Sequence, residues 1–401
     1  MTFSASLYRS SRRLAWCAFA LTCTASLSAW AAADAPLATL ERMHSFDGKD
    51  GKIATSSLIM GSDGRVHGAA DTSFRMKRSG EFKVVNAFNQ KALGTSASGL
   101  TQGTDGQYYG VTMSGGEHKV GTAYRMTPQG EVTVLHHFDM HAPEGGIPAT
   151  PLLQASDGAF YGTTSNGGDG GRGSLFRVTA EGDFKVLHHF SLAPTNVWAS
   201  PEVPLLQAGD GHLYGTTRGG GTFNSGAIYR WKLDGTWEVL YSFQHGSGGG
   251  DMPASDLVQA PDGMLYGTTE SGGDHGGGTF YRFDPATRAV TLLHHFFASA
   301  AGASHPVGTL LRARDGYFYG VATVGGKNDK GGVFRLNTAG EYAQVYDFPA
   351  ASDMLGYLPQ AGLVEANDGV FFGTFFFGGE FNQGSIYRLK LNERQAERSI
   401  Q

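Results

Sequence analysis

The sequence predicts an all-β fold, a seven-bladed β-propeller whose blades are four-stranded antiparallel sheets. Three observations carry this prediction. One repeat unit recurs seven times along the chain, and each unit contains four short runs of strand-forming residues separated by turn residues. The last unit lacks its fourth run, and a matching run precedes the first unit. This arrangement predicts a ring closed by the N-terminal strand.

The composition supports a β-rich globular chain. Of the 401 residues, 60 are Gly, 12% are aromatic and only 17% are charged. The apolar content is sufficient to bury a core, which argues against global disorder, and the absence of a three-residue Gly period excludes collagen. Abundant Gly and aromatic residues without long amphipathic segments favour strands joined by turns.

Residues 1–33 are interpreted as a secretory signal peptide outside the fold. They contain three arginines near the start, an apolar stretch over 14–27 and small residues for cleavage over 29–33. The segment 11–13 is a weak twin-arginine candidate, and an anchor that is never cleaved is the alternative. No later apolar run is long enough to span a membrane. We therefore expect residues 34–401 to form one secreted or periplasmic domain.

Charge and cysteine usage narrow the function classes. Cys17 and Cys23 both lie in the leader, so the mature chain is expected to lack disulfides and thiol chemistry. Loss of the leader with its three arginines takes the formal charge from −5 to −8. A net acidic chain without a basic tract argues against nucleic acid as a partner. We expect a monomer that needs no cofactor.

The repeat is marked by an Asp-Gly pair. The pairs begin at Asp63, Asp105, Asp157, Asp210, Asp262, Asp315 and Asp368, with separations of 42, 52, 53, 52, 53 and 53 residues. The predicted blades are 55–98, 99–150, 151–203, 204–256, 257–309, 310–362, and 363–391 together with 38–46. The first separation is ten residues shorter because the first unit lacks the Gly-Gly loop of the others.

The third unit illustrates the predicted strands, which we name A to D in chain order. They are 152–154, 160–164, 175–178 and 186–190. Asp157-Gly158 is expected to make a tight A–B hairpin because Gly accepts the positive φ that such turns require, and Glu181-Gly182 is expected to do the same between C and D.

The two ends of the chain are predicted to share the last blade. Residues 385–389 resemble strand C, and the following residues turn polar without a convincing strand D. Residues 40–46 match the strand-D pattern instead. Pairing between these segments would remove the open sheet edges that a solenoid leaves.

The repeated text resembles a known family. The pattern LLQxxDGxxYGTTxxGGxxxxGxxxR, written out in the third unit, is similar to the GloVer tandem repeats of exported bacterial choice-of-anchor proteins, over residues 38 to 391. This resemblance implies export and a repeat fold but no particular activity. A looser similarity, in layout and in a Tyr–Arg pair, links the chain to seven-bladed propeller polysaccharide lyases such as ulvan lyases.

Loop length predicts which face of the ring binds a ligand. The A–B and C–D connections are short, whereas the B–C loop (165–173 in the third unit) and the D–A loop (191–203) are long. In a four-stranded meander these two long loops lie at the same end, and binding residues concentrate on such loops. The candidate ligand-binding residues there are Arg172, Arg218, His305, Lys327, Lys330 and Trp198.

Residues repeated in every blade are interpreted as structural. The Asp of each Asp-Gly pair is a turn residue rather than a calcium ligand, because the seven carboxylates are too far apart to share an ion. The pairs His136-His137, His188-His189 and His294-His295 fall on strand D of three blades, which indicates packing and not a zinc site. No metal is expected. The Gly-Gly pairs open no helix, so phosphate-loop interpretations fail.

Two functions remain open. The first is ligand binding, with a carbohydrate favoured because amides, guanidinium groups and planar rings suit hydroxyls and carboxylates. The second is β-elimination of a uronic-acid polysaccharide, in which a cation neutralises the carboxylate while His or Tyr moves the proton. The candidate catalytic residues are His118, Tyr161, Arg177 and His275.

The lyase hypothesis has a weakness in the repeat itself. The Tyr–Arg spacing of Tyr161 and Arg177 recurs in several blades, as in Tyr319 and Arg335, so the pair is more typical of blade architecture than of one active site. Glycoside hydrolysis would need two facing acids. The loop acids available for it, which the sequence does not pair, are Glu144, Glu202, Asp251 and Glu270.

Overall fold

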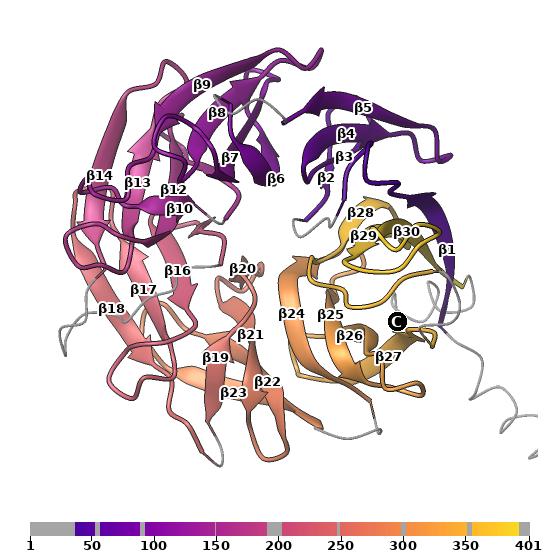
Figure 1. Ribbon diagram of the computed structural model, residues 1–401. Coiled ribbons are helices and arrows are strands. Elements are labelled where there is room, and N and C mark those ends of the chain that lie inside the picture. The colour runs from indigo at the N-terminus through magenta and orange to yellow at the C-terminus, as the bar shows by residue number, and fades with distance from the viewer. Residues whose placement is uncertain are drawn as a thin grey trace, which may run out of the picture. The chain divides into compact units, whose positions relative to one another are not determined.

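The computed structural model describes residues 37–52, 57–88, 93–148, 150–190, 203–246, 249–297, 302–350 and 355–392. They belong to one compact unit, Leu37–Gln401. Its described part forms seven antiparallel sheets and no helix, and the sheets stand in a ring around a central space (Figure 1). The predicted seven-bladed β-propeller is confirmed. The predicted leader, 1–33, lies outside the described residues.

Blades 1 to 4 follow each other along the chain, and in each of them the last strand lies at the periphery (Figure 1). Blade 1 contains β2 (Ile59–Met60), β3 (Val66–Ala69), β4 (Thr72–Met76) and β5 (Phe82–Ala87); blade 2 contains β6 (Thr95–Gln102), β7 (Tyr108–Ser114), β8 (Thr122–Met126) and β9 (Val132–His137); blade 3 contains β10 (Gly146–Pro148), β11 (Leu153–Gln154), β12 (Phe160–Asn166), β13 (Ser174–Val178) and β14 (Phe184–His189); blade 4 contains β15 (Leu206–Gln207), β16 (Leu213–Thr217), β17 (Ala227–Trp231) and β18 (Trp237–Ser242).

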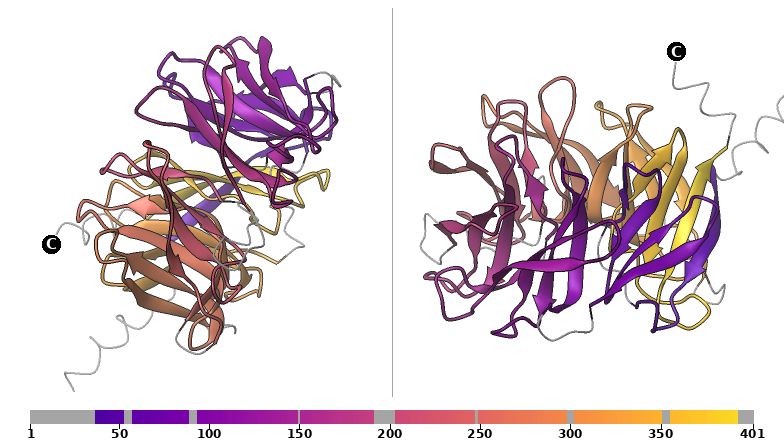
Figure 2. Two further views of the ribbon diagram at one scale, coloured as in Figure 1. Left: turned by 90° about the vertical axis from the view of Figure 1, so that its left-hand side faces the viewer. Right: turned by 90° about the horizontal axis from the view of Figure 1, so that it is seen from above.

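Blades 5 to 7 complete the ring, and in side view the strands run between its two faces (Figure 2). Blade 5 contains β19 (Gly250–Pro253), β20 (Val258–Gln259), β21 (Leu265–Gly272), β22 (Gly276–Phe283) and β23 (Val290–Phe297); blade 6 contains β24 (Ala303–Arg312), β25 (Phe318–Gly325), β26 (Gly332–Leu336) and β27 (Tyr342–Asp347); blade 7 contains β28 (Val364–Asn367), β29 (Val370–Phe375), β30 (Ser385–Leu391) and β1 (Ala38–Ser45).

Strand A is less regular than the sequence predicts. In blades 3 and 5 it is interrupted, so that β10 and β11 both pair with β12, and β19 and β20 both pair with β21. The interruption in blade 5 covers Ala254–Leu257 and follows Pro253, whose ring leaves no N–H for the ladder. This irregular backbone faces the central space.

The predicted closure by both ends of the chain is confirmed. β1 pairs antiparallel with β30, with Leu40 opposite Leu389 and Arg42 opposite Tyr387 (Figure 1). The ring of His44 on β1 also stacks on Phe82 of blade 1, with centroids 3.7 Å apart. The N-terminal strand therefore completes blade 7 and contacts blade 1.

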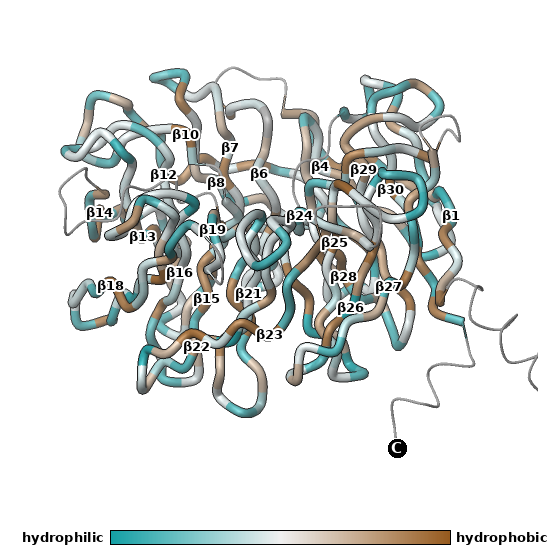
Figure 3. The backbone as a smooth tube through the Cα atoms, turned by 90° about the horizontal axis from the view of Figure 1, so that it is seen from below, coloured by the Kyte–Doolittle hydropathy of each residue, from teal (hydrophilic) through white to brown (hydrophobic). Residues whose placement is uncertain are grey.

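The core is divided among the blade interfaces. Seven clusters of buried apolar side chains occur in the described part of the chain, and each joins two neighbouring blades. Hydrophobic segments follow the strands, and the connecting loops are largely hydrophilic (Figure 3). Gly162 on β12 is required by this packing, because a Cβ there would lie 2.7 Å from Cζ of Phe176 on β13.

The strand-D histidines belong to these interfaces. The rings of His136, His188 and His294 stack on Phe184, Trp237 and Tyr342, the aromatic residue of strand D in the next blade, at centroid distances of 3.6, 3.9 and 4.7 Å. Burial lowers the pKa of each of these three histidines to about 4. They are therefore neutral aromatic packing residues at neutral pH.

Candidate functional site

The end of the ring that carries the Asp-Gly turns, here called the turn face, has the same network in successive blades. Asp157 accepts the N–H of Ala159 through Oδ1, and its Oδ2 accepts the Tyr161 hydroxyl at 2.9 Å and the Arg177 Nε at 3.3 Å. The same Tyr-to-Asp hydrogen bond recurs at Tyr109–Asp105, Tyr214–Asp210, Tyr266–Asp262 and Tyr319–Asp315. Tyr161 and Arg177 thus brace a turn.

The environment of Tyr161 makes it a poor general base. Burial, together with the hydrogen bond to the Asp157 carboxylate, raises the pKa of Tyr161 above its usual value. The phenol is therefore protonated at neutral pH, and its hydroxyl proton is already donated to Asp157.

The opposite end, here called the loop face, gathers the long connections as the sequence predicts. The D–A loop after blade 2 bonds to the B–C loop of that blade, through Ile147 N–H and the Val120 carbonyl at 2.8 Å. The loop after blade 4 does the same through Met252 N–H and the Ser225 carbonyl at 3.1 Å. B–C and D–A loops therefore support each other around one face.

The predicted catalytic histidines lie on the loop face, away from Tyr161 and Arg177. The Nδ1 of His118 is 3.8 Å from Oδ2 of Asp139, and the ring of His275 stacks on Phe297 with centroids 3.9 Å apart. Tyr161 lies near the start of β12, whereas the loop face lies at the other end of this strand. Tyr161 and that end are five residues apart, and this corresponds to a distance of about 16 Å along the strand. The structure does not bring these four residues together.

The tips of the B–C loops share one backbone geometry. Lys119, Asn224, Asp329 and Asn382 have positive φ values of 66°, 57°, 51° and 55°, and Gly171 and Gly276 occupy the matching position in blades 3 and 5. The residue before this position lies at the tip of the loop. The residues at the tips include His118, 46% exposed, and Phe223 and Phe381, 49% and 53% exposed.

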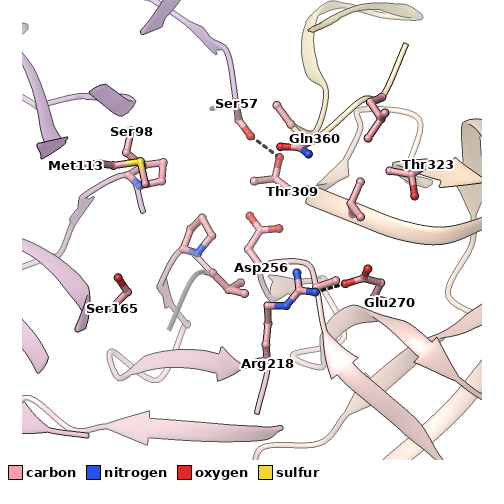
Figure 4. A pocket seen from close by; sticks show the side chains of 18 of the residues that line it. Ser57, Ser98, Met113, Ser165, Arg218, Asp256, Glu270, Thr309, Thr323 and Gln360 are labelled. Carbon is pink, nitrogen blue, oxygen red and sulfur yellow. Dashed lines mark hydrogen bonds and ion pairs between the residues drawn. The ribbon is translucent and has the colours of Figure 1, made fainter. Parts of the chain in front are cut away.

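The central space holds a cavity of about 690 Å³ (Figure 4). Its size falls in the range of small-molecule sites, roughly 300–1,000 Å³. The described wall is rich in hydroxyl, amide and carboxylate groups and contains no aromatic ring. The polar side chains that line it are Ser57, Ser98, Ser165, Arg218, Asp256, Glu270, Thr309, Thr323 and Gln360.

Strands A and the ends of strands B position these groups. Ser57 and Thr309, on the strand-A sides of blades 1 and 6, lie 3.1 Å apart through their hydroxyls. Arg218 and Glu270 occupy the same position at the end of strand B in blades 4 and 5, and they form an ion pair through Nη2 and Oε2 (Figure 4). The only lining arginine is thereby engaged within the described wall.

Asp256 lies in the strand-A interruption of blade 5. Its Oδ1 accepts the N–H of Leu310 on β24 at 2.8 Å, which links blades 5 and 6. Burial raises the pKa of Asp256 to about 7, opposed by backbone hydrogen bonds. The carboxyl points into the cavity near the Arg218–Glu270 pair (Figure 4).

The structure distributes the remaining predicted residues around the loop face. Arg218 lines the cavity, whereas the others do not. Lys327 is exposed, and its backbone N–H donates to Asp347. Arg172 and Lys330 are half-buried in B–C loops, and His305 is half-buried near the start of β24. Trp198 and Glu202 lie outside the described residues.

The sequence analysis missed Asp256, although a signal for it exists. Asp256 stands six residues before its Asp-Gly pair, a position that holds Ser57, Pro151, Pro204 or Thr309 in other blades. A single acid among small or proline residues marks a blade-specific change. The long loops were the expected location of the site, and Asp256 lies in the interruption of strand A instead. Within the described part, no group of three or more His, Cys, Asp or Glu residues could hold a metal.

The closed ring and the central cavity define a seven-bladed β-propeller with a cavity at its axis. The chain belongs to the Gloeobacter/Verrucomicrobia repeat family, whose model matches residues 70–260 and 247–400. No helix among the described residues is both long and apolar enough to cross a membrane. Comparison with curated proteins finds no match.

Several solved structures resemble this chain over most of its length. A gluconolactonase of Xanthomonas campestris is 13% identical with a TM-score of 0.45, over 90% of this chain and 93% of that one. A protein of unknown function from Dyadobacter fermentans is 14% identical with a TM-score of 0.45, over 88% and 99%. A quinoprotein alcohol dehydrogenase-like protein of Bacteroides thetaiotaomicron is 13% identical with a TM-score of 0.46, over 73% and 65%.

These identities concern the fold alone and carry no argument about ligand or activity. None of the three is an ulvan lyase, and the resemblance to polysaccharide lyases stays a hypothesis from sequence.

Proposed function

We propose that this chain is an exported β-propeller that binds a carbohydrate in the central cavity of the loop face. The observation that carries the proposal is the cavity itself, with about 690 Å³ of space and a wall in which hydroxyl, amide and charged groups alternate with apolar side chains such as Met113, Val307 and Leu358. Such groups match sugar hydroxyls, each of which both donates and accepts hydrogen bonds.

The wall combines polar and apolar groups, which suits a sugar, since a sugar ring presents hydroxyls at its edge and C–H groups on its faces. Residues from all around the ring converge on the cavity, among them the polar Ser165, Thr323 and Gln360 and the apolar Ile147 and Leu358. Since the described wall holds no aromatic ring, stacking on a sugar would come from the rim, where Phe223 and Phe381 are exposed. A glycan longer than the cavity could then extend across the loop face.

A blocked cavity tests this proposal. Ser165 lines the cavity, and its neighbour on β12, Asn166, is exposed and points to the other side of the strand. We expect Ser165→Trp to abolish binding of any glycan that the full chain retains on an array, while Asn166→Trp binds normally. Equal binding by both variants in calorimetry would place the site elsewhere. Ultraviolet absorbance from an unsaturated product would show cleavage by elimination.

Export is a separate part of the proposal. It rests on the leader-like composition of residues 1–33 and on the resemblance to exported repeat proteins. Mass spectrometry of the chain produced in its own cell type should find the N-terminus at or close to residue 34, in the periplasm or the medium. An intact N-terminus in the cytoplasmic fraction would contradict it.

A further inference from the structure

The charges around the cavity do not cancel. Among the described lining residues, three are charged, namely Arg218, Asp256 and Glu270, and Arg218 is paired with Glu270. An ionised Asp256 therefore leaves the wall with one net negative charge. This negative charge is specific to blade 5, since no other blade has an acid at the position equivalent to Asp256.

Among the described residues, the groups facing Asp256 offer it no unpaired cation. Its own hydrogen-bond partner is the Leu310 N–H from blade 6, at 2.8 Å. On the blade 5 side lies Tyr281, a fully buried tyrosine whose hydroxyl has no hydrogen-bond partner and whose pKa is raised by burial and by the charge of Asp256. Tyr281 therefore provides no positive charge to balance Asp256. The guanidinium of Arg218 is already paired with Glu270.

A half-buried carboxylate such as that of Asp256, with no cation among its described neighbours, is stabilised either by a proton or by a partner from outside. In the empty cavity the proton suffices, which agrees with the raised pKa of Asp256. A ligand that brings an ammonium group would replace that proton and form a desolvated ion pair in the cavity.

We propose that the cavity recognises a sugar bearing an ammonium group, with Asp256 as the counter-ion of the ammonium and the surrounding hydroxyls as partners of the sugar. This inference rests on the proposed carbohydrate binding and adds the charge of the ligand. The Ser57 and Thr309 hydroxyls, which belong to the same strand-A ring as Asp256, would bind the sugar hydroxyls next to the ammonium.

Proton linkage gives this proposal a signature. Binding of an ammonium requires the ionised form of Asp256, so binding releases a proton wherever the empty site is protonated. The affinity should rise by up to tenfold per pH unit below pH 7 and level off above it. The other titratable groups around the cavity are Arg218 and Glu270, which pair with each other, and Tyr281, whose pKa is raised by burial so that it stays protonated in that range.

The test uses matched probes on the full chain. A 2-aminoethyl hexose glycoside carries an alkyl ammonium, with a pKa of about 10 as in Lys, and the 2-hydroxyethyl glycoside of the same sugar is its neutral control. Calorimetry at pH 8 should show at least tenfold tighter binding of the ammonium glycoside, and this preference should shrink as the pH falls from 7 to 5. 2-Aminoethanol should bind at least tenfold more weakly than the ammonium glycoside.

Variants separate the role of Asp256 from general charge effects. Asp256→Asn should lose both the preference and the pH dependence, and Asp256→Thr, which installs the residue that blade 6 carries at this position, should do the same if the amide variant folds poorly. Asp251→Asn, at an acid of the same blade that pairs with His245 outside the cavity, should retain both.

The outcomes distinguish this inference from the proposed function. Equal affinity for the ammonium and neutral glycosides, or a preference that survives in Asp256→Asn, overturns the inference while carbohydrate binding stands. Equal affinity for 2-aminoethanol overturns the sugar component. If no glycoside of any hexose binds at any pH, the proposed function fails as well.

Discussion

The two faces of this propeller differ in how much they vary from blade to blade. On the turn face, the Asp carboxylate accepts a Tyr hydroxyl in five blades, at 2.7 to 2.9 Å. On the loop face, the end of strand B carries Met113, Ser165, Arg218, Glu270 or Thr323. Residues that recur in the blades stabilise the fold of each blade. Residues that differ between blades can instead contribute to a single ligand site. A Tyr–Arg pair that recurs in five blades therefore belongs to the scaffold.

The largest effect is expected for a repeated residue of the core. Gly162→Val should destabilise the fold by about 3 kcal/mol or more, because its side chain would overlap Phe176 and Leu152. Gly171→Ala, at an open loop tip with φ of 69°, should cost only about 1 kcal/mol for the left-handed backbone. Urea denaturation measures both. An equal loss of stability in both variants would contradict the difference between the core and the loops.

The turn network comes next. Asp157→Ala should cost about 2–3 kcal/mol, because it removes the acceptor of the Tyr161 hydroxyl and of the Arg177 guanidinium. Asp169→Ala, at an exposed loop acid near His189, should change stability by less than about 0.5 kcal/mol. A comparable loss of stability in Asp169→Ala would contradict the structural ranking of the two faces.

The blade interfaces should make the protein acid-sensitive. His136, His188 and His294 have folded pKa values of about 4, below the ordinary value of 6.5. The unfolded chain therefore binds more protons between pH 6.5 and 4, and stability falls as the pH falls through that window. His188→Phe, which keeps the stacking on Trp237, should reduce the fall in melting temperature, whereas His245→Gln, at an exposed histidine, should not.

The smallest effect is expected at the loop tips. His118→Ala and His275→Ala should each change the free energy of unfolding by less than about 0.5 kcal/mol, because both side chains are exposed. Binding assays on the same variants test whether these residues contact a ligand. A loss of glycan affinity without a loss of stability would show that the loop tips belong to the rim of the site. A large loss of stability would show that they stabilise the fold.

Much of the fold follows from the repeat in the sequence. Local turn chemistry and strand pattern predict the Asp-Gly turns, the four strands of each blade and the pairing of residues 40–46 with the last blade. The same pattern recurs in each unit, so each unit supports the prediction made from the others. The candidate site was predicted only in part. Arg218 was among the expected residues, while Asp256 was not, because the acid at its repeat position distinguishes blade 5 from the others but does not show that the residue faces a cavity.

The sequence alone determined the number of blades, the order of their strands and the identity of the residues that repeat, because each of these is encoded within a span of about 50 residues. Only the tertiary structure decided which blade-specific side chains meet. Arg218 and Glu270 are 52 residues apart, and Ser57 and Thr309 are 252 apart, yet each pair is in contact at the axis. Closing the ring creates those contacts, and the burial that gives Asp256 its altered pKa arises with them.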